Sequence, residues 1–315
     1  MAAITLTQAE TLQSLLLGGS KSRNLERGKN SLGSKSGGES QAPMRRPGHS
    51  AASKKRFAPA IQICCLGYFS IRRAGDGPIN IRMNTRPGAL LQLLIAVGPG
   101  GIEKHQAANL LWPQPDGKTA HGALDSTLYR LRQLLDIDAA CRAEHGVIML
   151  DRSIVSIDAW VFDDEAESLL VRLKRPADNL DGGEIAIRCQ RLLELYLGPF
   201  LALETSAPWI LRTRDRLQAK FVRVMEEAGQ FWQSTGRWDR AVRLYEQALE
   251  SDNLSEAIYR ELIRCHLAQG HLSEAIGAFY RCRELLASVL GVAPSEETTA
   301  LYRCALVVNQ GDVEI

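Results

Sequence analysis

A 34-residue period near the C-terminus constrains the fold more than any other feature of the chain. A glycine, a small residue, an aromatic residue and a second small residue recur in register, as Gly236, Ala241, Tyr245 and Ala248 and then as Gly270, Ala275, Phe279 and Cys282. This period and these residue types are typical of tetratricopeptide repeats, in which small residues let two helices approach and aromatic rings fill the groove. One departure is Asn253, where the motif usually has proline. The pattern predicts an all-α helical repeat domain, which we place at residues 159–308.

The most regular amphipathic stretch lies between residues 119 and 136, and it predicts a helix. Its apolar residues align on one side at i, i+4 and i+7 spacings: Ala120, Leu124, Leu128, Leu131 and Leu135. The opposite side is small near its start, then polar and aromatic, and then basic. Such a face is typical of a helix that enters a DNA major groove, with donors for base edges and arginines for phosphates. The alternative is the solvated face of an ordinary amphipathic helix.

The segments before this helix favour the DNA-binding interpretation. Short antiparallel strands are expected between residues 60 and 82, with INIR at 79–82 as the last of them. A first helix then begins after the N-cap Thr85, and its apolar stripe ends at Val97. A second helix is expected at 103–112, with Leu110 facing inward. These two helices would cover the apolar side of the helix at 119–136 and turn its polar face outward.

The segment after the helix completes the pattern. Residues 147–158 read as a β-hairpin around 151–153, which places Arg152 at its tip. Strands, three helices and a hairpin within about 100 residues form a winged helix-turn-helix, an α+β unit that we assign to residues 60–158. The chain as a whole is therefore expected to be mainly α-helical, with this unit followed by the helical repeats.

DNA contacts are expected from seven side chains: Lys118, His121, Ser126, Tyr129, Arg130, Arg132 and Arg152. The basic residues on the helix neutralise phosphates or reach guanine, the serine and the tyrosine read base edges, and the arginine of the hairpin touches the DNA backbone. Residues 57–158 carry ten Lys and Arg against nine Asp and Glu, so a single copy makes few phosphate contacts. We therefore expect a homodimer on direct or inverted repeats in double-stranded DNA.

The first folded segment resembles the OmpR-type winged helix of the antibiotic-pathway activators, the SARP or AfsR-like regulators. The resemblance is carried by ALLQLL, LLWP and HGALDSTLYRLRQLL, followed by VSIDAWVFDDE. It implies that Arg130 and Arg132 match the basic pair of the family's recognition helix, and that the loop 113–117 contacts RNA polymerase. The basic residues usual early in that helix are replaced here, by Gly122, Asp125 and Ser126.

The second half is similar to the bacterial transcriptional activation domain that follows the winged helix in the same regulators. GPFL at 198–201, the run PW…RDRL at 208–217 and LLASVLGVAPSEET carry this similarity. The resemblance covers roughly residues 60–308. It implies a sequence-specific transcriptional activator that recruits RNA polymerase, with a helical domain for oligomerisation or partner contact. The weak charge of residues 57–158 motivates an alternative, a tetratricopeptide adaptor in a signalling pathway whose winged helix does not bind DNA.

The remaining segments are expected to be an N-terminal arm and a short tail. Residues 1–59 are rich in Ser, Gly, Lys and Arg, with ten basic against three acidic residues in 1–56, and they predict a disordered basic arm. Residues 309–315 are a tail. The longest apolar run, 89–97, has nine residues, too few for a membrane span, and no secretory signal is expected. We expect a cytoplasmic, nucleoid-associated protein.

The sequence carries no pattern that indicates an enzyme. It has no phosphate-binding loop, no nucleophile elbow and no H-E-x-x-H zinc motif. Its seven cysteines are scattered, without metal-binding spacing, and are expected to be reduced thiols in helical cores. We therefore expect no catalytic residue, no cofactor and no metal site.

Overall fold

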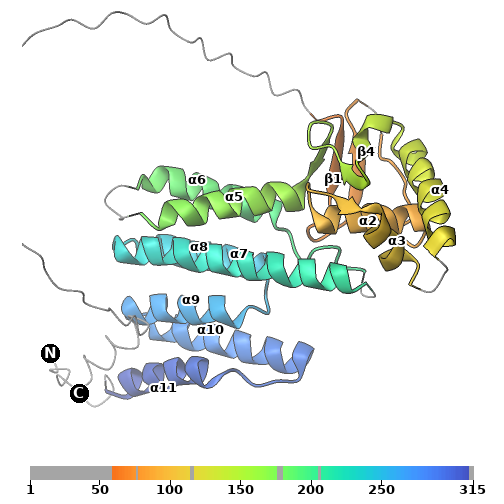
Figure 1. Cartoon of the computed structure of the whole chain (residues 1–315). Coiled ribbons are helices and arrows are strands. Elements are labelled where there is room, and N and C mark those ends of the chain that lie inside the picture. The colour runs from red at the N-terminus through yellow and green to blue at the C-terminus, as the bar shows by residue number, and fades with distance from the viewer. Residues whose placement is uncertain (1–58, 76, 114–116, 176–179, 205–206, 312–315) are drawn as a thin grey trace, which may run out of the picture. The chain divides into compact units, whose positions relative to one another are not determined.

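The computed structural model describes residues 59–311, apart from 76, 114–116, 176–179 and 205–206. The side chains of 117–119 and 309–311 are also outside the description. The expected basic arm and C-terminal tail thus fall almost entirely outside the described residues. In the described part, two small sheets and three helices come first and a series of longer helices follows (Figure 1). The chain is mainly α, as predicted.

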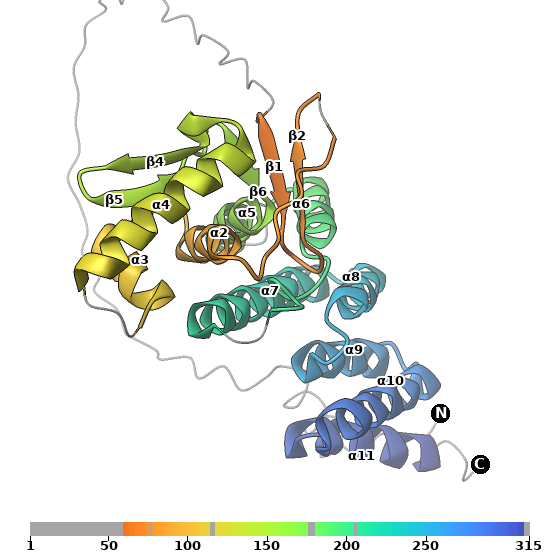
Figure 2. The same cartoon turned by 90° about the vertical axis from the view of Figure 1, so that its right-hand side faces the viewer.

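Three helices form the core of the N-terminal part: α2 (Arg86–Val97), α3 (Lys104–Leu111) and α4 (Gly117–Leu135). The first begins where predicted, because the Thr85 hydroxyl accepts a hydrogen bond from the backbone N–H of Gly88 at 3.3 Å. The second and third pack against each other, and both contact α2 (Figure 2). As a result, every member of the α4 apolar stripe is buried, which confirms the predicted orientation of that helix.

Two predictions of inward-facing side chains in these helices are wrong. Val97 and Leu110 are 41% and 44% exposed. Val97 is the last residue of its helix. Leu110 lies off the stripe that α3 buries, which consists of Ala107, Ala108 and Leu111.

The strands form two three-stranded sheets. In the first, with order β2-β1-β6, β1 (Ile61–Cys64) pairs antiparallel with β2 (Ser70–Arg73) and parallel with β6 (Val155–Ile157). In the second, with order β3-β5-β4, β5 (Val147–Leu150) lies between β3 (Ile102–Glu103) and β4 (Cys141–Glu144). The predicted antiparallel pairing near residue 60 is confirmed, but residues 79–82 form no strand.

The wing is a different hairpin from the predicted one. It consists of β4 and β5, joined by His145 and Gly146, whose φ angles of +50° and +81° match a tight two-residue hairpin turn. The predicted hairpin around 151–153 is wrong, because β6 leaves β5 and pairs with β1, far away in the sequence. Asp151 and Ser153 do form a turn there, but it connects two sheets.

The C-terminal part is all-helical. It comprises α5 (Asp158–Leu173), α6 (Gly182–Leu195), α7 (Pro208–Ser234), α8 (Trp238–Ser251), α9 (Glu256–Ala268), α10 (Leu272–Leu285), a π-helical turn (Leu286–Leu290) and α11 (Glu296–Gly311). From α7 to α11, each helix packs against the next. The first half of the structure thus carries the sheets, and the second carries the stacked helices.

The 34-residue repeat is confirmed in detail. Both repeat glycines lie just before a helix, at φ angles of +72° and +74° that favour glycine. The small and aromatic residues of the motif are buried in both copies, on α8 and on α10. In addition, Gly229 on α7 lies against the ring of Tyr245, so a side chain at 229 would overlap that ring. The motif therefore does what its residue types predict, since it brings neighbouring helices close together.

Backbone pairing joins the two parts of the chain. Leu66, just after β1, forms an antiparallel bridge with Phe200, and Leu201 donates a backbone hydrogen bond to Cys65 at 2.8 Å. Gly67 makes this approach possible, because a Cβ there would lie 2.8 Å from the backbone of Leu197. An isolated backbone bridge thus links the segment after β1 to the helical part.

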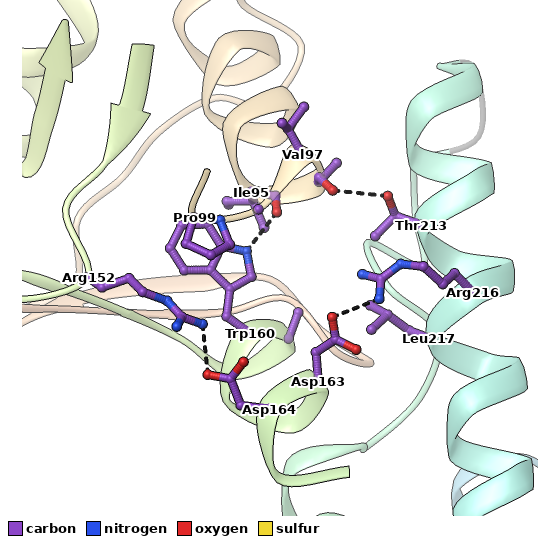
Figure 3. A pocket seen from close by; sticks show the side chains of 13 residues that line it. Ile95, Val97, Pro99, Arg152, Trp160, Asp163, Asp164, Thr213, Arg216 and Leu217 are labelled. Atoms are coloured by element: carbon purple, nitrogen blue, oxygen red, sulfur yellow. Dashed lines mark hydrogen bonds and ion pairs between the residues drawn. The ribbon is translucent and has the colours of Figure 1, made fainter. Parts of the chain in front are cut away.

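The first turn of α5 strengthens this junction. The Asp158 carboxylate accepts hydrogen bonds from the backbone N–H groups of Cys65 and Leu66, at 2.8 and 3.0 Å. Burial raises the pKa of Asp158 above its usual value, although these hydrogen bonds act in the opposite direction. Two residues further on, the Trp160 indole donates to the carbonyl oxygen of Ile95 at 2.8 Å (Figure 3). Helix α5 therefore contacts both the sheet and the end of α2.

Candidate nucleic-acid interface

Helix α4 presents a continuous polar face to solvent. Its exposed residues are His121, Gly122, Asp125, Ser126, Tyr129, Arg130, Gln133 and Leu134. The ring of Tyr129 is 63% exposed, which is high for a large aromatic side chain. The apolar stripe behind this face is fully covered, so the helix has a fixed orientation and offers the same side chains to any partner.

The start of this face is slim. A side chain at Gly122 would meet no atom within 4 Å, so the surface is open there. The Ser126 hydroxyl donates to the Gly122 carbonyl oxygen at 3.0 Å, one turn earlier, and therefore lies close to the helix. Its oxygen still has lone pairs to accept a hydrogen bond. This half of the helix leaves room for a close approach of another backbone or of base edges.

The predicted basic pair divides into two different environments. Arg130 is exposed, on the outer face. Arg132 is half-buried, and its Nε–H donates to the carbonyl oxygen of Cys141 in β4 at 2.9 Å. Arg132 therefore connects α4 to the wing, and only the rest of its guanidinium is left for an outside partner.

The single acidic side chain in the middle of the face is paired. Asp125 Oδ1 accepts a hydrogen bond from Lys104 Nζ at 2.8 Å. Asp136, just beyond the helix, pairs with Arg73 at 3.1 Å, and Arg73 also donates to the carbonyl oxygen of Leu135. These pairs neutralise the two carboxylates on and just beyond α4, and Arg73 also satisfies a carbonyl at the C-terminus of the helix.

Arg152 does not lie at the wing tip, contrary to the sequence prediction. Its guanidinium donates to Asp164 at 2.9 Å and lies 5.6 Å from the ring centre of Trp160 (Figure 3). Both partners are on α5. Arg152 also lines a cavity of about 300 Å³ between the ends of α2, α5 and α7. The prediction failed because the turn at 151–153 connects two sheets and is not the end of a hairpin.

The residues that occupy the wing were not predicted from the sequence. Arg142 is exposed on β4 and is paired with Asp151, whose pKa is lowered chiefly by a hydrogen bond from Ser153. His145 is exposed in the wing turn. The signal was present in the sequence: a histidine and a glycine stand between CRAE and VIML, two runs of strand length.

Two predicted features fall wholly or partly outside the described residues. Lys118 belongs to the first turn of α4, but its side chain lies outside the described residues. The proposed polymerase-contacting loop at 113–117 includes 114–116, which are also outside them. His121 lies at the start of the exposed face.

Among the described residues, no group of three or more His, Cys, Asp and Glu side chains is arranged to hold a metal ion. The cysteines are unpaired thiols, and burial raises the pKa of Cys189 to about 12 and that of Cys141 to about 11. No helix in the described part of the chain is long and apolar enough to cross a membrane.

Comparison with known proteins agrees with this organisation. Residues 157–306 match the family model of the bacterial transcriptional activator domain. No curated protein matches the chain. Among solved structures, the chain is similar to Mycobacterium tuberculosis EmbR in complex with a low-affinity phosphopeptide, with a TM-score of 0.54 and 19% identity over 80% of this chain.

The chain spans 66% of the EmbR chain, and at this identity the likeness concerns the fold. The matched activator domain begins at the last residue of β6, directly after the winged helix. This order is the one that the sequence resemblance implied. The chain thus combines a winged helix with a match to the bacterial transcriptional activator domain over residues 157–306, and in this order it is similar to the SARP-like transcriptional regulators.

Proposed function

We propose that the chain is a sequence-specific DNA-binding transcriptional regulator that acts at the nucleoid as an activator. Helix α4 lies in the major groove, and the β4–β5 wing contacts the neighbouring DNA backbone. The helical part, 159–308, mediates self-association or contact with a partner. The loop 113–117, beside the exposed Leu110, contacts RNA polymerase.

One observation carries this proposal, the exposed face of α4. A helix whose apolar stripe is completely buried has a fixed orientation, and here the fixed face is narrow at its start and polar and basic further on. Tyr129, which is 63% exposed, adds an aromatic ring with a hydroxyl group to this face. Major-groove recognition uses both features, since the helix must enter the groove and then contact bases and phosphates.

The proposed contacts follow from the position of each side chain. Arg130 contacts a phosphate or guanine, and Tyr129 and Ser126 contact base edges or sugar. Lys118 and His121 contact phosphates at the start of the helix. Arg132 adds its free guanidinium nitrogens to a phosphate while it holds the wing through Cys141.

The wing contacts are reassigned from Arg152 to Arg142 and His145. Arg142 is exposed on β4, and His145 stands in the turn between the two strands of the wing. Both arginines are ion-paired, Arg142 with Asp151 and Arg152 with Asp164, but Arg142 lies on the wing and Arg152 at the junction between the two parts of the chain. We therefore expect substitution of Arg142 to weaken DNA binding more than substitution of Arg152.

A homodimer on repeated half-sites is the proposed functional form. Residues 57–158 carry ten basic and nine acidic residues, so one winged helix offers few phosphate contacts. A site with about three to five such contacts weakens steeply as salt increases. Two copies on one DNA increase the affinity, because the second binds at a high effective concentration.

The direct test compares Arg130→Ala with Arg223→Ala. Arg223 is a matched control, since it is 56% exposed on α7 and removes the same charge far from α4. We expect Arg130→Ala to weaken binding to promoter DNA by roughly 5- to 100-fold, with a salt slope smaller by about 1 if the contact is to phosphate. Arg223→Ala should leave both values unchanged.

Binding is measured by fluorescence anisotropy of the full chain on labelled duplexes at several salt concentrations. If both variants behave like the wild type, α4 does not lie in the groove. If the wild type binds no DNA even at low salt but retains a protein partner, the adaptor alternative is correct.

A further inference from the structure

Asp125 is an unexpected residue for a helix that approaches phosphates. It lies on the exposed face of α4, one turn before Tyr129, and its side chain is 60% exposed. A carboxylate at this place repels the DNA backbone unless its charge is compensated or used. In the structure, Lys104 compensates the charge, and one carboxylate oxygen remains for a contact with DNA.

Lys104 compensates the charge and fixes the carboxylate. Its ammonium group donates to Asp125 Oδ1 at 2.8 Å, while Oδ2 has no donor among the described residues. An exposed ion pair of this kind contributes little to the stability of a fold. The pair is therefore better explained by the orientation that it gives to the carboxylate than by the stability that it adds.

Lys104 also connects the carboxylate to the wing. It is the first residue of α3, and its backbone N–H donates to the carbonyl oxygen of Gly146, in the wing turn, at 2.8 Å. One residue thus joins the turn of the wing, through its backbone, to the recognition helix, through its side chain. Through these two contacts Lys104 connects Asp125 to the wing turn.

The chemistry of the free oxygen identifies what it recognises. In the major groove, cytosine presents a lone amino donor, and carboxylate side chains accept from it. Adenine also presents an amino group, but its N7 beside that group is an acceptor that repels a carboxylate. Guanine and thymine present acceptors to this side. A fixed carboxylate with one free oxygen therefore discriminates for cytosine.

We propose that Asp125 is a specificity-determining residue that accepts a hydrogen bond from the amino group of a cytosine in the major groove, and that Lys104 is its positioning residue. This inference rests on the proposed function, because it requires that α4 lie in DNA. Asp125, which stands where the family's helix is usually basic, thus recognises one base pair.

The experiment selects bound sequences from a random duplex library with the full chain. Asp125→Asn is compared with Asp136→Asn, a matched control that removes the same charge from an exposed ion pair at the end of α4. We expect Asp125→Asn to change the preference at one position from cytosine to adenine, because an amide pairs with adenine. The change in relative affinity should be about tenfold, as measured afterwards on defined duplexes. Asp136→Asn should select the wild-type sequence.

Variants of Lys104 test the positioning role. Lys104→Gln should reduce the preference for cytosine at the same position, and Lys104→Arg, which keeps the charge and the donors, should retain it. The base preference of Lys104→Gln distinguishes positioning from a structural role, because the loss of a merely structural pair would not change the preference at one base pair. Circular dichroism of each variant confirms that the fold is retained.

Two results would overturn the inference. If Asp125→Asn raises the affinity equally for all sequences, the carboxylate acts only as a repulsive charge. If Asp125→Asn selects the wild-type sequence at unchanged affinity, the carboxylate reads no base. A wild-type chain that enriches no sequence would instead refute the proposed function itself, and this outcome is distinct from the other two.

Discussion

Substitution of Gly229 by alanine tests whether the repeat motif holds the helices together as the structure indicates. Gly229 lies within α7, opposite the fully buried Tyr245 of α8. A Cβ at this position would lie 2.0 Å from the Tyr245 Oη and 2.1 Å from its Cζ. Because two atoms of a rigid ring are involved, the whole ring would have to move. Its hydroxyl would also leave Gln233, which donates to it at 3.0 Å.

The magnitude follows from two opposing effects. Alanine favours the helix over glycine by about 1 kcal/mol. Overpacking of a buried ring costs about 1–3 kcal/mol, and the short distances place this case at the upper end. The net effect of Gly229→Ala is therefore a loss of about 2 kcal/mol in the free energy of unfolding. For a folded unit of this size, the melting temperature falls by roughly 4–8 °C.

Gly277→Ala is the matched control. Gly277 lies within α10, and a Cβ there would meet no atom within 4 Å. Only the helix-propensity effect remains, so this variant should melt roughly 2–4 °C above the wild type. Both variants are measured by thermal unfolding, followed by circular dichroism. If Gly229→Ala melts at or above the wild-type temperature, the close approach of α7 and α8 is wrong.

Two further predictions concern the end of the repeats and the junction. Glu256 accepts hydrogen bonds from the backbone and hydroxyl of Ser295; burial raises its pKa, but these bonds outweigh burial and leave the pKa below the usual 4.5. A carboxyl group whose pKa is lowered by folding stabilises the protein fully above its pKa in the unfolded chain, and this contribution is lost as the pH falls through its pKa in the folded chain. In urea titrations, the free energy of unfolding of the wild type should therefore exceed that of Glu256→Gln by its full amount at pH 7 and by less below about pH 4.5. A fragment of residues 59–157 should be unfolded by circular dichroism while residues 59–315 fold, because the fragment lacks Asp158 and the partners of Leu66; a cooperatively folded fragment would contradict the shared junction.

The helices could be predicted from the sequence because their burial is periodic. In the stripe on α4 and in the 34-residue motif, the buried residues recur at the spacing of a helix, so the sequence alone indicates which positions are buried. The N-cap at Thr85 was likewise local, since its hydrogen bond spans three residues. The existence and orientation of α4 therefore followed from neighbouring residues alone.

The strand pairing could not be predicted in the same way. The segment at 155–157 pairs with Ile61 and its neighbours, which lie more than ninety residues earlier, and nothing in its own pattern identifies that partner. A turn at 151–153 flanked by apolar residues fits a hairpin equally well. The correct wing depended on His145 adopting a positive φ beside Gly146, a conformation in which histidine is uncommon.

The candidate site divides along the same line. Exposure of Tyr129 and Arg130 followed from the helical wheel, because it depends only on their angle from the leucine stripe. The roles of Arg132 and Asp125 depended on Cys141 and Lys104, which come from other elements. A wheel assigns a side chain to a face, but it does not reveal which polar groups on that face are already paired.

The error at Arg152 points to how the two halves of the protein act together. The sequence predicted Arg152 at the wing tip, but in the structure its guanidinium pairs with Asp164 on α5. Beside this pair, Arg216 of α7 pairs with Asp163, and the Thr213 hydroxyl donates to the carbonyl oxygen of Ala96 in α2 (Figure 3). These three contacts form a seam between the winged helix and the helical part. With the bridge between Leu66 and Phe200, the seam joins winged helix and helical part at two separate places. Two such attachments prevent rotation about a single linker, since each fixes what the other leaves free. The helical part therefore has two points of attachment to the winged helix, and under the proposed function a partner of the repeats would take a defined position relative to the DNA in contact with α4.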